Sequence, residues 1–163
     1  MTFDLPPLFR KRCLATLLLL ALSLGSAGCG LKKRTRALFG GQLPLVVEVG
    51  AAVNRDSPIA VDVLAVYQPR TLDRLMELSA HDYFVQKEQL KRDYPETFEI
   101  VGSWELVPGQ RVFEAPLDYR AGADALLIYA DYFDPGPHRF RLETRRQARL
   151  ILEESGFRVE VSK

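Results

Sequence analysis

The sequence has few of the residues that catalysis, metal binding and covalent cross-linking require. Its 163 residues include only two cysteines, Cys13 and Cys29, and two histidines, His81 and His138. The positions of these four residues do not match the spacing of a zinc site with nitrogen and sulfur ligands. No serine stands in a G-x-S-x-G motif, and no glycine-rich phosphate loop is present. We therefore expect no metal site, no cofactor and no enzymatic activity.

The sequence also lacks a surplus of charge of either sign. It contains 22 Lys and Arg against 21 Asp and Glu. Residues 1–28 hold three of the basic side chains and one of the acidic ones, which leaves 19 against 20 in residues 29–163. A protein that binds nucleic acid normally carries a basic patch that neutralises phosphates. A nucleic-acid partner is therefore not expected.

No apolar run is long enough for a permanent membrane span. The run from Cys13 to Leu24 has 12 residues, whereas a spanning helix needs about 20. The basic residues Arg10, Lys11 and Arg12 precede this run, and small residues at 25–28 follow it. This order is typical of a cleaved export signal. The sequence thus predicts a signal peptide over residues 1–28.

Cys29 closes this segment. The tetrapeptide 26–29, Ser-Ala-Gly-Cys, resembles the bacterial lipobox, although Ser26 occupies a position where leucine is more common. We expect Cys29 to be lipidated; an ordinary secretory cleavage that leaves a free thiol is the alternative, and both export the chain. With Cys13 removed and Cys29 acylated, no pair remains for a disulfide.

Residues 29–42 predict a flexible tether rather than a folded element. The segment carries four basic residues, Lys32, Lys33, Arg34 and Arg36, and ends near Gly40 and Gly41 without a sustained periodicity. Such a stretch beside a lipid anchor can bind an anionic membrane surface, or it can serve as a plain solvated linker. The sequence leaves both interpretations open.

From residue 43 to 163 the pattern is mainly that of β-strands. Apolar residues alternate through Ile59–Tyr67, and turn residues at 54–58 separate this run from an earlier one at Leu45–Val49. Seven or eight short strands predict a β-sandwich. The further strands are expected at 98–101, 104–107, 111–114, 125–133 and 140–143, with a closing hairpin of 148–153 and 157–161.

A two-helix insertion at about residues 71–94 interrupts the strands. Leucines recur at helical intervals from Thr71 to Ser79, and Thr71 is expected to cap this first helix. Ser79 is expected to cap a second helix that ends before Pro95. Tyr83, Phe84 and Leu90 form an apolar stripe on the second helix, which we expect to cover the sheet.

The ordered set of these segments resembles one family. Six segments follow one another in a fixed order. They are a lipobox, a short strand, the turn Asn-Arg-Asp-Ser-Pro at 54–58, the strand at 59–67, the helical insertion ending in Asp-Tyr-Pro at 93–95, and the segment Trp-Glu-Leu-Val-Pro-Gly-Gln at 104–110. A late strand at 126–133 follows them. The set resembles the outer-membrane lipoproteins of type VI secretion systems, the TssJ family.

The resemblance implies a transthyretin-like β-sandwich that is anchored in the outer membrane and faces the periplasm. It implies as partner the periplasmic C-terminal domain of the inner-membrane core protein, TssM. Gly30, where an aspartate would favour retention in the inner membrane, agrees with outer-membrane sorting. The loop between the first two strands, at about residues 51–58, would contact the partner. The candidate contact residues are Asn54, Arg55, Asp56, Ser57 and Pro58, which an ordinary exposed turn would explain equally well.

Two other functions remain open at this stage. One is a pilotin-like lipoprotein chaperone of another secretion system, which would accept a peptide strand at a sheet edge or groove. The other is a periplasmic ligand-binding or enzymatic domain, for which convergent acids in a deep pocket would be the sign. Asp62 and Asp131 interrupt otherwise apolar strands, and a structural role in hydrogen bonding is the simpler interpretation of both.

Overall fold

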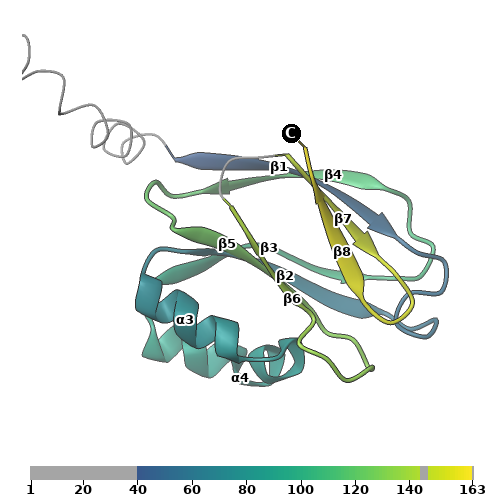
Figure 1. The fold of residues 1–163 in the computed structure, drawn as a ribbon, viewed down its shortest axis with the longest axis horizontal. Coiled ribbons are helices and arrows are strands. Elements are labelled where there is room, and N and C mark those ends of the chain that lie inside the picture. Colours follow the sequence, from purple (N-terminus) through teal and green to yellow (C-terminus); the bar gives the residue numbers. More distant parts are fainter. Residues whose placement is uncertain (1–39, 144–146, 163) are drawn as a thin grey trace, which may run out of the picture. The chain divides into compact units, whose positions relative to one another are not determined.

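The computed structural model describes residues 40–143 and 147–162 (Figure 1). The predicted signal peptide at 1–28, Cys29 and the tether residues before Gly40 lie outside the described residues. In the part of the chain that is described, no helix has the length and apolar character needed to cross a membrane.

The described residues form two four-stranded sheets and two helices. One sheet has the order β4-β1-β7-β8 and the other the order β3-β2-β5-β6. All neighbouring strands run antiparallel except β1 and β7, which are parallel. The prediction of a mainly β sandwich with a two-helix insertion is confirmed. The strands are β1 (Gly41–Val49), β2 (Ile59–Val66), β3 (Phe98–Leu106), β4 (Phe113–Tyr119), β5 (Ala125–Ala130), β6 (Arg139–Leu142), β7 (Ala148–Leu152) and β8 (Phe157–Val161).

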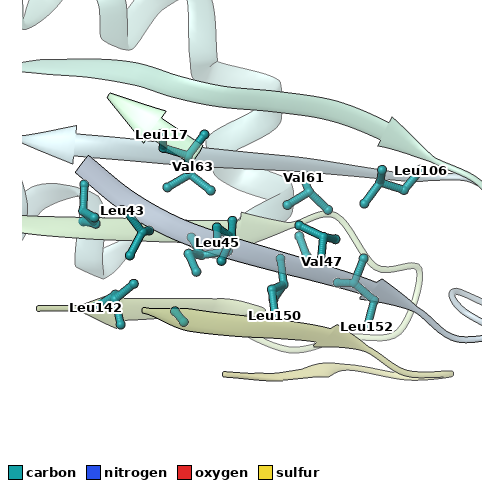
Figure 2. Packing of buried hydrophobic residues seen from close by; sticks show 14 of the residues in the cluster. Leu43, Leu45, Val47, Val61, Val63, Leu106, Leu117, Leu142, Leu150 and Leu152 are labelled. Atoms are coloured by element: carbon teal, nitrogen blue, oxygen red, sulfur yellow. The ribbon is translucent and has the colours of Figure 1, made fainter. Parts of the chain in front are cut away.

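The main core lies between the two sheets (Figure 2). Successive side chains of a strand point to opposite faces, so alternate residues of β1 enter the core: Leu43, Leu45, Val47 and Val49. Their polar neighbours, such as Glu48, lie on the outer face of that sheet. Each fully buried Leu or Val side chain contributes about 1.5–3 kcal/mol to stability.

The helices α3 (Pro69–Glu77) and α4 (Ala80–Asp93) cover the outer face of the β3-β2-β5-β6 sheet (Figure 1). Leu75 of α3 and Tyr83 of α4 are fully buried against Leu64 of β2 and Tyr129 of β5. Strands β2 and β5 are therefore buried on both faces. This explains why they are apolar almost throughout.

The two predicted helix caps have different outcomes. Ser79 caps α4 as expected, because its hydroxyl oxygen accepts a hydrogen bond of 3.1 Å from the backbone N–H of Asp82. The prediction for Thr71 is wrong. Helix α3 begins at Pro69, whose fixed φ suits a first helical position, and Thr71 is buried within the helix.

Several strand boundaries also differ from the sequence prediction. Strand β1 begins at Gly41, four residues before the predicted Leu45. Segments 98–101 and 104–107 are one strand, β3, in which a register shift opposite Val63 and Leu64 absorbs the break in alternation. Strand β4 runs from Phe113 to Tyr119, well beyond the predicted 111–114, because Pro116 is tolerated at a sheet edge. Strand β5 ends at Ala130, so Asp131 and Phe133 belong to the following loop.

Candidate functional site

Four loops meet at the end of the sandwich where β1 stops, which we call the loop end (Figure 1). They are residues 50–58, 107–112, 131–138 and 153–156. Backbone hydrogen bonds join the first two of them and the end of β7: the N–H of Gly109 donates to the carbonyl of Gly50 at 3.0 Å, and the N–H of Gly50 donates to the carbonyl of Leu152 at 2.9 Å. The buried Tyr132 hydroxyl donates to the carbonyl of Gly156 at 2.5 Å. The loop end is therefore one connected scaffold.

Asn54 joins two of these loops. Its side chain is 1% exposed, and its amide Nδ2 donates to the carbonyl of Pro58 at 2.9 Å. Its Oδ1 accepts a 2.8 Å hydrogen bond from the backbone N–H of Phe133. The side chain of this candidate partner-binding residue thus points into the protein. From inside the protein, its two hydrogen bonds hold the β1–β2 loop to the β5–β6 loop.

The β1–β2 loop has an unusual backbone. Asn54, Arg55 and Asp56 have φ angles of 49°, 56° and 58°, so three consecutive residues other than glycine are left-handed. Asn and Asp tolerate this region better than other side chains, whereas Arg55 is there at a cost of about 1–2 kcal/mol. The hydrogen bonds of Asn54 hold the segment in this conformation. The side chains of residues 55 and 56 consequently project from a fixed backbone.

Arg55 and Asp56 are exposed, as expected for contact residues. The guanidinium of Arg55 forms an ion pair and hydrogen bond with Asp134 of the β5–β6 loop, which raises the pKa of Arg55. Ser57 is half-buried, and its hydroxyl lies 3.4 Å from the Arg55 carbonyl. Pro58 is exposed and precedes β2. The five candidates therefore divide into exposed side chains and residues that shape the loop, and their contact with a partner stays a prediction.

A pocket of about 530 Å³ adjoins these residues, between the β5–β6 loop and the start of α4. Phe133 at its edge is 67% exposed, although its neighbour Tyr132 is 5% exposed. The sequence prediction missed this residue because it assigned Phe133 to a continuous β-strand. The change from alternating apolar residues to Asp-Tyr-Phe-Asp-Pro-Gly-Pro-His at 131–138 was the available signal that the strand had ended. The pocket is lined by Ser79, His81, Asp131, Tyr132, Phe133, Asp134, Pro135, Gly136 and His138.

Asp62 lies away from the loop end, under α4. Its carboxylate is 1% exposed, accepts a 2.7 Å hydrogen bond from the Tyr83 hydroxyl and pairs with the Lys87 ammonium at 2.7 Å. Burial, followed by the charge of Asp62, raises the pKa of Tyr83. Both of these side-chain contacts join α4 to β2, so Asp62 has a structural role.

A second polar cluster lies near the opposite end of the sandwich. Glu99 accepts a hydrogen bond from the Tyr67 hydroxyl and pairs with Arg120, whose guanidinium stands 4.4 Å from the Tyr67 ring centre. The backbone N–H of Arg120 also donates to Glu99 at 3.0 Å. Burial and the hydrogen bond to Glu99 raise the pKa of Tyr67 to about 12. These contacts join the β4–β5 loop to β3 and leave no oxygen of Glu99 unbound.

Neither cluster is arranged for metal binding. Within residues 40–143 and 147–162, no group of three or more His, Cys, Asp or Glu side chains could hold a metal ion. The described part of the chain also has no buried side-chain nitrogen or oxygen without a hydrogen-bond partner. The loop end combines a backbone held by hydrogen bonds with the exposed side chains of Arg55, Asp56 and Phe133.

No protein-family model matches the sequence, and no curated protein gives a significant match to it. Solved structures do match the fold. The type VI secretion lipoprotein TssJ1 from Pseudomonas aeruginosa matches with a TM-score of 0.58 and 15% identity, over 76% of this chain and 98% of that chain. The membrane-bound type VI component Lip from Serratia marcescens matches with a TM-score of 0.57 and 18% identity, over 76% and 99%.

A chain of a type VI membrane complex matches with a TM-score of 0.56 and 13% identity, over 74% of this chain and 98% of that chain. Each of these comparisons covers nearly the whole of the matched chain and about three quarters of this chain. The β-sandwich with its two-helix insertion is the fold of the TssJ lipoproteins of type VI secretion systems, and this chain is a divergent example of that fold.

Proposed function

We propose that this protein is an outer-membrane lipoprotein of a type VI secretion membrane core complex. In this role it binds the periplasmic C-terminal domain of the TssM-like inner-membrane core protein, and it acts by assembly rather than by catalysis. The observation that carries the proposal is the fold shared with TssJ lipoproteins over nearly their full length. The lipobox ending in Cys29 supports it independently, because it is a property of the sequence and not of the fold.

The arrangement of β1 supports the same function. The tether enters the sandwich at Gly41, and the loop end begins after Val49 at the other end of the strand. Nine residues of extended chain span about 30 Å. The residue at which the tether joins the sandwich and the β1–β2 loop thus lie at opposite ends of β1.

The anchor and the docking loop can be tested separately. Cys29→Ser should move the full chain from the membrane fraction to the soluble fraction while its unfolding midpoint stays the same. Mass spectrometry of the wild-type protein should find an acylated cysteine at its N-terminus. An unmodified N-terminus at residue 29 would reject lipidation without affecting the binding proposal.

Docking is tested with Arg55→Ala combined with Asp56→Ala. Calorimetry against the purified periplasmic domain of the partner should show a loss of about 5- to 150-fold in affinity, as is usual for truncation of interface residues. Arg74→Ala on α3 is the matched control, because Arg74 is an exposed arginine in an ion pair with Glu77. If the double variant and the control bind the partner with equal affinity, the β1–β2 loop is not part of the interface.

A further inference from the structure

The pocket beside the β1–β2 loop has a composition that identifies a ligand type. Its walls are apolar or aromatic at Tyr132, Phe133, Pro135 and Gly136, and they carry two carboxylates and two imidazoles. A volume of about 530 Å³ falls within the range of about 300–1,000 Å³ found for small-molecule and cofactor sites, and it is large enough to admit a side chain of a partner. No Lys or Arg is among its lining residues. The pocket thus combines negative charge with an aromatic surface.

The contacts within the loop show which of these groups are available. Asp134 is occupied by Arg55, and the Nε2 atom of His138 lies 2.8 Å from the Asp134 carbonyl. The His138 ring packs on Tyr132 with 4.8 Å between ring centres. The carboxylate of Asp131, which is 30% exposed, is paired within the described residues only with His81, at 3.5 Å. Asp131 is therefore the carboxylate that is left to bind a group from outside.

Phe133 is held in position for the same purpose. Its backbone N–H is bound by the buried Asn54, and its two neighbours in sequence are fixed, Tyr132 by burial and Asp134 by Arg55. The loop is also bound to the helices, since the N–H of Ala80 donates to the carbonyl of Pro137 at 2.9 Å. An exposed aromatic ring on a fixed backbone loses little conformational entropy when it makes a contact. Such rings are common anchors of interfaces.

We infer that this pocket receives an arginine side chain of the partner protein, with its guanidinium against the Asp131 carboxylate and its plane against the Phe133 ring. Arginine fits better than lysine, because a planar guanidinium can pair with a carboxylate and stack on an aromatic ring at the same time. The Arg55–Asp134 pair shows that this loop already accommodates one guanidinium from its own chain. The inference rests on the proposed function, since it assigns a contact within the same loop end.

The first test does not need the partner. The full chain in detergent micelles is titrated with N-acetyl-arginine methylamide and observed by NMR. The shifts should be confined to residues 79–81 and 131–138 and should saturate with a millimolar dissociation constant. The citrulline analogue, which has the same shape without the charge, should bind at least about tenfold more weakly, because it cannot form a charged pair.

Two variants and two controls assign the effect to the pocket. Asp131→Asn should reduce the affinity for the arginine probe to that for the citrulline probe. Phe133→Leu keeps an apolar side chain but removes the aromatic face, and should weaken the arginine probe by about threefold or more. Asp73→Asn on α3 and Val85→Ala on α4, both at exposed positions, should change nothing. Equal binding of the arginine and citrulline probes, or shifts spread over the surface, would overturn the inference.

The second test uses the periplasmic domain of the partner. Asp131→Asn and Phe133→Leu should each weaken its binding by about fivefold or more. Each arginine of that domain is then changed to lysine in turn. One of these changes should weaken the affinity for the Asp131→Asn variant much less than the affinity for the wild type, as expected when the changed arginine pairs with Asp131. If the wild type binds but no arginine is coupled to Asp131, the inference fails. If the wild type does not bind the partner domain, the proposed function fails. The titration with the arginine and citrulline probes then decides by itself whether the pocket binds a guanidinium.

Discussion

Replacement of Asn54 by alanine tests whether the loop end is one connected scaffold. The side chain contributes two hydrogen bonds, to the Pro58 carbonyl at 2.9 Å and from the Phe133 N–H at 2.8 Å. Alanine leaves both backbone groups without their partner, at about 1 kcal/mol or more each because the surroundings are partly buried. It also places a residue that is not Asn or Gly at a φ of 49°, which costs about 1–2 kcal/mol. We expect a loss of about 3–4 kcal/mol in the free energy of unfolding.

Two further substitutions at the same position separate these contributions. Asn54→Asp tolerates the left-handed backbone, but it buries a charge and turns a carboxylate oxygen toward the Pro58 carbonyl. Asn54→Gly loses both hydrogen bonds and removes the backbone strain. The free energies of unfolding should therefore decrease in the order wild type, Gly, Ala, and the Asp variant should also be less stable than the wild type.

Thermal and urea unfolding of the full chain measure this order. A loss of 3 kcal/mol corresponds to a fall of about 12 °C in the unfolding midpoint for a domain of this size. In the alanine variant the Phe133 amide should also exchange its hydrogen faster, because its acceptor is gone. If Asn54→Ala leaves both the midpoint and this exchange rate unchanged, the two loops are not joined through Asn54, and the preorganisation of Phe133 would have to be rejected.

Three other predictions address the remaining structure. Trp104 is half-buried at the edge of the main core and packs edge-on against Phe113, with 6.1 Å between the ring centres. Trp104→Ala should therefore lower the free energy of unfolding, measured in urea, by about 2–3 kcal/mol, less than the roughly 3–5 kcal/mol typical of a fully buried tryptophan. Asp62→Ala should cost about 3–5 kcal/mol by the same measurement, because it removes the buried partner of Lys87 and Tyr83. Burial opposes the ionisation of Glu99, but hydrogen bonds from Tyr67 and Arg120 outweigh it and lower its pKa. The stabilisation by Glu99 is thus complete above its unfolded pKa of about 4.3 and is lost as the pH falls through its folded pKa. In the Glu99→Gln variant the unfolding midpoint should therefore decline less over that acidic range.

Elements with a local cause could be predicted from the sequence. The run 59–67 predicted β2, because its β-branched and apolar residues are interrupted only by Asp62 and follow the turn residues at 54–58. Ser79 predicted the start of α4, because the cap forms within one helical turn. Strand ends that depend on distant partners were harder to predict. The strand β3 is continuous through Gly102 because β2 pairs with it along its whole length, a fact that the local sequence does not contain.

The candidate site shows the same division. The sequence placed a polar loop at 51–58 and named its five residues, but it could not show which side chains point outward. Asn54 is buried because its partners are Pro58 and the Phe133 backbone, and the second of these is 79 residues away. Phe133 was assigned to β5, although the turn residues at 131–138 indicate that the strand ends before it, and its exposure depends on how this loop packs. Local patterns thus predict elements, whereas the exposed surface depends on how the loops pack together.

The buried contacts under α4 also contribute to the loop end. Ser79, which caps α4, and His81 in its first turn both line the pocket. The Asp62 contacts with Tyr83 and Lys87 join the following turns to β2. A buried ion pair adds little net stability compared with apolar packing, but it specifies one position of the helix on the sheet. Changes at Asp62 should therefore alter the pocket wall as well as the stability of the domain. The core also contributes to the pocket directly, because Tyr132 belongs to the main core and lines the pocket.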